Sequence, residues 1–254
     1  MDDQRGYRPV DFHCHLDLLP DMRAAYERCE KLRCTTLTVT TTPKAFKRNQ
    51  EYASKTQHVH AALGLHPQLV AKRGEEIQLF EELAHTTRFI GEIGLDAGRS
   101  HYPSFDLQKR VFERALDVCA RQGDKVISVH SVRSAKHVLD AIEVSGVNSS
   151  CAVVLHWFSA GAAEIRRAIS LGCWFSVNER MLSSSSGKEL LSLAPPNHLL
   201  TETDAPFLEV GGRPIQPGDV NKAVTMIAAH HGTDEIVMGK IISDNAERLL
   251  SPSI

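Results

Sequence analysis

VDFHCH, residues Val10–His15, combines a short apolar run with two histidines at alternate positions. The run predicts a buried β-strand. Because side chains at i and i+2 of a strand share a face, His13 and His15 should project together while Cys14 points the other way. Asp11 would lie on the same face one step earlier, where its carboxylate could orient a histidine. Two imidazoles side by side at a strand end are suitable metal ligands.

Seven further runs of β-branched or apolar residues follow along the chain. The eight predicted strands are Val10–His15, Thr36–Thr40, Val59–Gly64, Phe89–Ile93, Val126–His130, Ala152–His156, Cys173–Val177 and His198–Thr201. Amphipathic stretches lie between them, and the predicted helices are Met22–Leu32, Glu75–Leu83, Asp106–Gln122, Ala135–Ile142 and Ala162–Ser170, with two or three more in the tail Val220–Leu250. Ser183–Ser186 is expected to be a loop or the start of a helix. Eight strand–helix units in series predict an α/β fold, the closed (β/α)₈ TIM barrel.

The length of the chain agrees with that fold. One-domain α/β barrels commonly have about 250 residues, and no composition break or linker divides this chain of 254. We therefore expect a single domain over residues 1–254. The alternative is a doubly wound open sheet, but no glycine-rich phosphate loop follows the first predicted strand.

Composition narrows the class of protein. A formal net charge of −2 argues against a protein that holds nucleic acid mainly by counterion release, although an enzyme that contacts a few phosphates remains compatible with it. The six cysteines form no CxxC pair, which is typical of small buried side chains in a reducing compartment. No signal-peptide pattern is present, and no apolar run reaches the roughly 18–20 residues of a membrane span. We predict a cytoplasmic protein without membrane contact.

Other metal-type residues fall at the ends of later strands. Glu92 ends the fourth predicted strand, His130 the fifth and His156 the sixth, and Asp204 follows the eighth. In a (β/α)₈ barrel these strand ends converge on one face, where active sites lie. Four histidines and two carboxylates around one mouth are typical of a two-metal hydrolase, because bound cations compensate buried carboxylates.

A set of motifs makes the sequence resemble the TatD family of metal-dependent deoxyribonucleases, among the amidohydrolase-like barrels. The motifs are DFHCHLD (Asp11–Asp17), GLHP (Gly64–Pro67), IGEIGLD (Ile90–Asp96), VHS (Val129–Ser131), LHWFS (Leu155–Ser159), TETDAP (Thr201–Pro206) and NAERL (Asn245–Leu249). Each is weak alone, but in this order they are specific and cover nearly the whole chain. The Trp157 version of LHWFS and the stretch GCWFSVN (Gly172–Asn178) are most similar to the subgroup found beside anti-phage Qat defence operons.

The resemblance implies a metallo-dependent hydrolase with two divalent metal ions, either Mg²⁺, Mn²⁺ or Zn²⁺. It assigns His13, His15 and Asp204 to one ion and His130 and His156 to the other, with Glu92 bridging both. Asp204 and Glu92 are the expected catalytic residues. Water activated by the ions would attack phosphorus, and Asp204 would hold that water and accept its proton. Asp11 and Glu202 would support the ligands.

Substrate contacts are expected from loops at the same face. The resemblance places His66 near a substrate phosphate, and Arg99 and Arg133 are further candidates. Basic loop residues that follow the strands are Lys44, Lys47, Arg48, Arg99, His101, Arg133, Arg180 and Arg213, which would give a basic mouth to a nearly neutral chain. Trp157, Phe158 and Trp174 could stack on bases, although core packing is the favoured interpretation.

Three departures from the family pattern leave the metal ligands intact but put the substrate preference in doubt. Gln68 stands where a second histidine often follows HP, Val132 separates Ser131 from Arg133, and Leu208–Gly218 replaces a basic segment. The expected substrate is DNA, at single-stranded regions or ends, with protein partners from a defence operon. Two alternatives are a hydrolase of a small amide, ester or lactone, and a non-catalytic barrel subunit of a defence complex.

Overall fold

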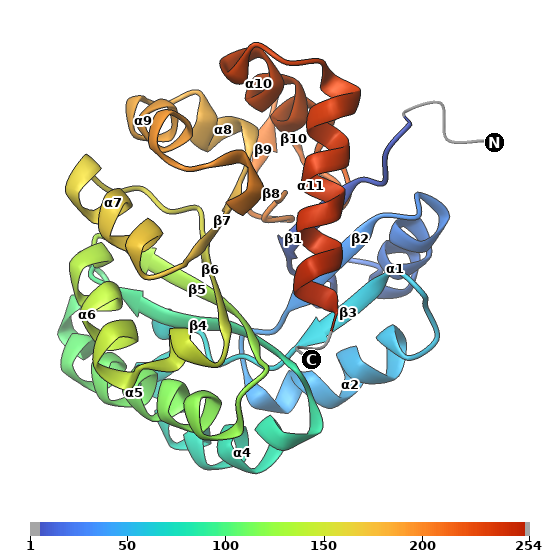
Figure 1. Cartoon of the computed structure of the whole chain (residues 1–254). Coiled ribbons are helices and arrows are strands. Elements are labelled where there is room, and N and C mark those ends of the chain that lie inside the picture. The colour runs from blue at the N-terminus through green and yellow to red at the C-terminus, as the bar shows by residue number, and fades with distance from the viewer. Residues whose placement is uncertain (1–5, 252–254) are drawn as a thin grey trace.

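Eight strands run parallel at the centre of the protein, and helices surround them, in a computed structural model that describes residues 6–251 (Figure 1). The strands are β1 (Val10–Cys14), β2 (Thr35–Val39), β3 (Val59–Ala62), β4 (Phe89–Asp96), β5 (Val126–Val132), β6 (Ala152–His156), β7 (Trp174–Val177) and β8 (Leu199–Thr201). The predicted barrel fold is confirmed. The ends of the predicted domain, residues 1–5 and 252–254, lie outside the described residues.

The helices form the outer layer and connect successive strands. They are α1 (Met22–Lys31), α2 (Pro43–Ala53), α3 (Val70–Arg73), α4 (Ile77–Leu83), α5 (Phe105–Gln122), α6 (Ala135–Ser145), α7 (Ala162–Ser170), α8 (Glu179–Leu182), α9 (Ser185–Leu193), α10 (Asn221–His231) and α11 (Glu235–Leu250). Short 3-10 turns lie at Leu16–Leu18, Pro67–Leu69, Gly74–Glu76, Ala84–Thr86, Tyr102–Ser104, Val147–Ser149 and Pro196–His198. In α5, Val111, Phe112, Ala115 and Cys119 recur at helical spacing, and this stripe is buried against the sheet layer.

The ring of strands has a first junction between β3 and β4. The hydrogen-bonded sheets are β1-β2-β3 and β4-β5-β6-β7-β8. The Gly91 N–H donates to the Leu63 carbonyl at 2.8 Å, and the Leu65 N–H donates to the Glu92 carbonyl at 3.0 Å. These bonds continue the parallel ladder from one sheet into the next.

The second junction joins the segment after the last strand to the carboxyl end of the first. The Asp204 N–H donates to the His13 carbonyl at 2.9 Å, and the His15 N–H donates to the Ala205 carbonyl at 2.8 Å. Three of the residues expected to bind metal therefore lie in the backbone that closes the barrel.

The predicted boundaries differ from the structure mainly at β4 and β5. Both strands extend further than expected, because their pairing continues to the partners Asp96 and Val132. Helix α2 was not predicted, although Pro43 at its first turn is a common start signal. Helix α9 begins at the serine run, and the tail contains two helices. The segment Leu208–Gly218 contains a small antiparallel hairpin, β9 (Glu209–Val210) and β10 (Arg213–Pro214).

All six cysteines are free thiols, and only Cys151 is partly exposed. Burial raises the pKa of the Cys29 and Cys173 thiols to about 12, so these thiols stay protonated near neutral pH. Among the described residues, no helix has the length and apolar character needed to cross a bilayer.

Gly64 lies where three strands approach closely. A Cβ at this position would lie 1.9 Å from the Thr40 carbonyl oxygen and 2.3 Å from the Glu92 nitrogen. The same two groups are hydrogen-bonded to each other, since the Glu92 N–H donates to the Thr40 carbonyl at 3.0 Å. Because both neighbours are backbone atoms, a rotamer change cannot make room for a side chain.

We expect Gly64→Ala to lower the free energy of unfolding by about 3 kcal/mol or more, because the backbone around it must shift. Gly161→Ala is the matched control, since a Cβ there would meet only the flexible Glu164 carboxylate, at 3.2 Å. Urea denaturation followed by circular dichroism measures both variants. A wild-type transition midpoint for Gly64→Ala would contradict this account of the close approach.

Candidate metal centre

The six residues proposed as metal ligands lie together at the carboxyl ends of the barrel strands. His13 comes from β1, Glu92 from β4, His130 from β5 and His156 from β6, while His15 and Asp204 follow β1 and β8. Each is less than 9% exposed. Buried polar groups of this density require compensation by hydrogen bonds or by bound cations.

Glu92 lies at the centre of this cluster. Its Oε2 atom is 3.4 Å from His13 Nε2 and 3.3 Å from His15 Nε2. Its Oε1 atom is 2.6 Å from His130 Nδ1 and 3.7 Å from His156 Nε2. The two oxygens of one carboxylate therefore face two different groups of imidazoles.

A local irregularity in β4 places Glu92 in this position. The pairing with β5 shifts register between Ile90 and Ile93, so Glu92 lies at a bulge within the strand. The sequence had suggested that Glu92 ends this strand. Gly94 makes the bulge feasible, because its φ is 144° and a Cβ there would lie 2.1 Å from the His130 carbonyl. The IGEIG sequence thus encodes both the carboxylate and the backbone that aims it.

His13 has the arrangement of a metal ligand. Its Nδ1 atom is hydrogen-bonded to Ser128 Oγ at 2.8 Å. When Nδ1 carries the ring hydrogen, Nε2 keeps its lone pair, and this buried nitrogen has no hydrogen-bond partner among the described residues. Burial, reinforced by positive charge at His156, lowers the pKa of His13 well below its ordinary value, which keeps the ring neutral. A neutral buried imidazole with a free nitrogen facing two carboxylates fits a divalent cation.

His156 is held by Glu202. The Nδ1 atom of His156 lies 3.0 Å from Glu202 Oε2, and the other Glu202 oxygen accepts a hydrogen bond from Asn178 at 2.9 Å. The His156 ring also stacks on His13 with centroids 3.6 Å apart. Burial alone would lower the pKa of His156, but the negative Glu202 outweighs it and raises that pKa to about 10. Glu202 therefore fixes the ring with Nε2 turned toward the cluster.

Asp204 completes the cluster from the β8 side. Its Oδ1 atom is 3.8 Å from His13 Nε2 and 3.7 Å from His15 Nε2. Its backbone has a φ of 51°, a left-handed conformation that is costly for a non-glycine residue and that recurs at functional sites. Burial raises the pKa of the Asp204 carboxyl to about 6, against the opposing effect of His156.

The charge on Glu92 is stabilised by its neighbours. Burial disfavours ionisation, but the electrostatic effect of the neighbouring imidazoles of His66, His13 and His130 outweighs it and holds the pKa of Glu92 well below its ordinary value. Glu92 in turn raises the pKa of His130 against the effect of burial. The cluster thus contains an ionised carboxylate that is shared by surrounding rings.

His66 lies inside the cluster and not only at its rim. Its Nε2 atom is 3.3 Å from Glu92 Oε2, and its ring is edge-on to His130 with centroids 4.8 Å apart. Three sets of residues present donor atoms close enough to hold an ion: His13, His156 and Asp204; His13, His15 and Glu92; and His66, Glu92 and His130. The third set includes His66, which the sequence had assigned to substrate phosphate alone.

Sequence reasoning missed several partners of the cluster. Asp96 lies 3.3 Å from His130 Nε2, and it accepts a hydrogen bond from Gln68 Nε2 at 2.8 Å. Gln68 stands where the family often has histidine, so this departure has a structural use. Asp96 belongs to the IGEIGLD motif. Its position two residues after Gly94 places both on the same face of the strand, and this was the sequence signal for the contact. Ser128, which holds His13, lies two residues before His130 on β5.

The expectation that Asp11 orients a histidine is wrong. Among the described residues, its carboxylate accepts hydrogen bonds from the Thr203 N–H and hydroxyl and from the Gly218 N–H, at 2.7 to 2.9 Å. The physical reason is a register shift in β1 between Asp11 and Cys14, which interrupts the two-residue alternation of faces. Burial raises the pKa of Asp11 to about 7. Asp11 ties β1 to the segment after β8.

The predicted substrate residues lie around the mouth of the barrel. Arg133 and Arg99 are exposed, and neither forms an ion pair within the described part of the chain. Lys44 instead pairs with Glu76 at 3.4 Å. A cavity of about 430 Å³ opens beside the cluster, and Arg133 and Trp157 line it together with His130, His156 and Asp204.

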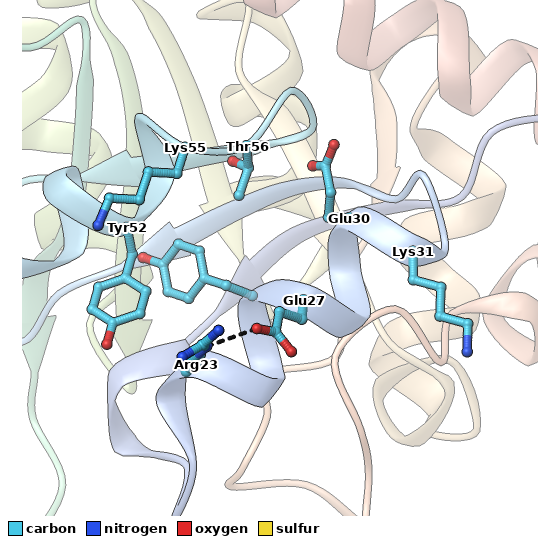
Figure 2. Close-up of a pocket in the computed structure, with 8 residues that line it drawn as sticks. Arg23, Glu27, Glu30, Lys31, Tyr52, Lys55 and Thr56 are labelled. Atoms are coloured by element: carbon cyan, nitrogen blue, oxygen red, sulfur yellow. Dashed lines mark hydrogen bonds and ion pairs between the residues drawn. The ribbon is translucent and has the colours of Figure 1, made fainter.

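A larger cavity, about 680 Å³, lies between α1 and α2 (Figure 2). Tyr52 and Lys55 line one part of it, and an ion pair joins Arg23 to Glu27 at 2.8 Å in another part. None of the proposed metal ligands contributes to it. Its size alone does not make it the reaction site, because the side chains with shifted pKa values and the converging metal-type residues lie at the barrel mouth.

Comparisons with known proteins agree with this geometry. The family model described as TatD related DNase matches residues 10–251. The uncharacterized metal-dependent hydrolase YjjV of Escherichia coli is 28% identical over 232 residues, covering 87% of this chain and 88% of YjjV. Its crystal structure superimposes with a TM-score of 0.85 at 23% identity, over 96% of this chain and 98% of that one.

Two relatives carry names that state an activity. Deoxyribonuclease Tat-D of Schizosaccharomyces pombe is 34% identical over 129 residues, which cover 51% of this chain and 40% of that protein. The 3'-5' ssDNA/RNA exonuclease TatD of Musicola paradisiaca is 27% identical over 197 residues, which cover 74% of this chain and 67% of that protein.

We expect Glu202→Gln to weaken divalent metal binding by about 10–100-fold, because His156 loses the carboxylate that fixes its ring. Isothermal titration of metal-free protein with Mn²⁺ measures the affinity. Glu209→Gln, on the exposed hairpin, is the matched control and should bind as wild type does. Unchanged affinity in a folded Glu202→Gln protein would show that His156 does not need this partner.

Proposed function

Because the chain belongs to the TatD related DNase family, we propose that it is a metal-dependent deoxyribonuclease that hydrolyses phosphodiester bonds of DNA. The observation that carries the proposal is the position of Glu92, whose two carboxylate oxygens face separate groups of imidazoles. That arrangement suits two cations bridged by one carboxylate. Phosphodiester hydrolysis is a reaction that such paired sites serve.

The residues present fit two divalent ions, which we propose to be Mg²⁺, Mn²⁺ or Zn²⁺. His13, His15 and Asp204 would hold one ion and His130 and His156 the other. Glu92 would bridge them, and His66 is near enough to Glu92 to ligate or to contact the phosphate. The donor set is nitrogen and oxygen throughout, with no thiolate, which these ions accept. Bound ions would supply positive charge to the phosphate and lower the pKa of bound water, to about 7 in the case of Zn²⁺.

The chain's own groups would position the reactants. The Asp204 carboxylate lies beside His13 and His15 and at the edge of the cavity, where it can accept the proton of the attacking water. Arg133, exposed at the same cavity, has a guanidinium free to contact a phosphate oxygen. Burial of the cluster excludes bulk water, which strengthens the electrostatic contacts of Asp204.

We propose unpaired DNA, in single-stranded regions or at ends, as the substrate. The net charge of −2 does not favour an extended electrostatic interface with duplex DNA, so binding must depend on a few local contacts. The cluster is buried below the barrel mouth, and a flexible unpaired strand reaches such a site more readily than a stacked duplex. The names of the fission yeast and Musicola relatives support a nucleic acid substrate.

We expect Asp204→Asn to lower kcat on single-stranded DNA by at least about a hundredfold, the lower range of general-base catalysis. End-labelled single-stranded and duplex oligonucleotides, with Mg²⁺, Mn²⁺ or EDTA, provide the measurement. Asp106→Asn is the matched control, because Asp106 is an exposed residue of the α5 first turn and should leave activity unchanged. EDTA should abolish cleavage by every variant.

Two results would overturn the nuclease proposal. One is hydrolysis of small esters, amides or lactones by wild-type protein that leaves all oligonucleotides intact. The other is near-normal DNA cleavage by a folded Asp204→Asn variant, which would remove this carboxylate from the reaction. Elemental analysis should find two divalent ions in each chain, and a single ion would contradict the bridged arrangement.

We further propose that the nuclease acts in anti-phage defence together with partner proteins. The support is the resemblance of LHWFS and GCWFSVN to the Qat-associated subgroup. Cells that carry the intact gene and its neighbours should reduce phage plating, and the Asp204→Asn gene should lose this protection. Full protection by the Asp204→Asn gene would separate defence from hydrolysis.

A further inference from the structure

The residues that line the cavity beside the metal cluster fall into two chemical groups. His130, His156 and Asp204 form the side that continues into the cluster. The other part of the lining, which we call the Trp157 wall, includes Trp157, Val132 and Arg133, which are an aromatic ring, an aliphatic side chain and a cation. The cavity measures about 430 Å³, which lies within the range of small-ligand sites.

Trp157 is held firmly in this wall. It follows β6 with a φ of 42°, and its backbone N–H donates to the Ser176 carbonyl at 3.2 Å. Its indole lies edge-on to His156, with an interplanar angle of 89° and centroids 6.4 Å apart. Part of the ring packs against the core, and part lines the cavity. Within the described residues, the indole N–H has no hydrogen-bond partner, so it can donate to a ligand.

The other aromatic residues considered from sequence are used differently. Phe158 is fully buried and packs on Phe175 with centroids 5.9 Å apart. Trp174 begins β7, at the far end of the barrel, where Arg248 lies 5.0 Å from its ring centroid. Core packing therefore accounts for these two rings but not for Trp157.

Val132 and Arg133 extend the same wall. Val132, the last residue of β5, is 44% exposed. Arg133 has a φ of 53°, a left-handed conformation that is strained for a non-glycine residue, and the chain turns at this point. The turn places an apolar surface and an unpaired guanidinium side by side at the cavity.

We propose that Trp157 and Val132 bind one unpaired nucleobase of the strand whose phosphate lies at the metal cluster, with Arg133 contacting the adjoining phosphate. The inference rests on the proposed nuclease function and names the part of the substrate that the cavity takes. Every base has a π face, so stacking on an indole gives affinity with little sequence preference. A base inside a duplex is already stacked on both faces, and the subsite therefore selects single strands and frayed ends.

Two small phosphodiesters isolate the base contribution. Thymidine 5′-p-nitrophenyl phosphate carries a base, and methyl p-nitrophenyl phosphate does not. We expect Trp157→Ala to lower kcat/KM on the thymidine ester at least about fivefold, mainly through KM, since base–aromatic stacking contributes this much or more. Hydrolysis of the methyl ester should be unchanged. Trp157→Phe should recover most of the loss.

Tyr102→Ala is the matched control, because Tyr102 is an aromatic residue 63% exposed on the loop after β4, outside the cavity lining. It should leave both esters unaffected. Equal losses on both esters for Trp157→Ala would overturn the base subsite, because they would indicate damage to the metal centre. Unchanged kinetics on both would overturn it as well.

A binding measurement separates failure of this inference from failure of the nuclease proposal. Oligothymidylate added to wild-type protein in EDTA should quench tryptophan fluorescence, and an abasic oligonucleotide of equal length should not. The signal lost in Trp157→Phe relative to wild type belongs to Trp157. Quenching in EDTA, together with no hydrolysis of oligothymidylate when Mg²⁺ or Mn²⁺ is supplied, would support the base subsite and refute the nuclease. Equal quenching by both oligonucleotides would refute the subsite whatever the activity.

Discussion

A single buried carboxylate organises the carboxyl end of this barrel. Glu92 keeps its negative charge in a buried environment because imidazoles surround it, and each of its oxygens faces a different group of them. The rest of the centre depends on this arrangement. Ser128 and Glu202 turn individual rings toward the carboxylate, and Asp204 closes the opposite side. Bound cations would stabilise so many ionisable groups at such close range, because they compensate the buried negative charge.

The fold supplies this centre through deviations from regular structure. β4 carries a bulge at Glu92, β1 carries another between Asp11 and Cys14, and Asp204 adopts a left-handed backbone. Regular strands would alternate their side chains strictly and could not aim so many groups at one point. The strain is tolerated because the surrounding ladder and the close packing at Gly64 hold the chain in place.

Sequence reasoning recovered the architecture because the hydrophobic periods of strands and helices are local properties. It also brought the six proposed ligands to one mouth, since parallel strand ends converge. It failed for Asp11, because a bulge changes the face of a side chain without leaving a clear mark in the sequence. It also missed the contact of Asp96 with His130 and Gln68, which depends on how far β4 extends. Such details are set by tertiary contacts between segments far apart in the chain.

The junction between the first and last strands has a consequence for biogenesis. Asp204 donates its backbone hydrogen to His13, so the same two residues complete both the ring of strands and the ligand set. A nascent chain on the ribosome has its first histidines long before it has this aspartate. The centre therefore forms only after translation has passed β8, and a truncated product of the gene carries an incomplete ligand set.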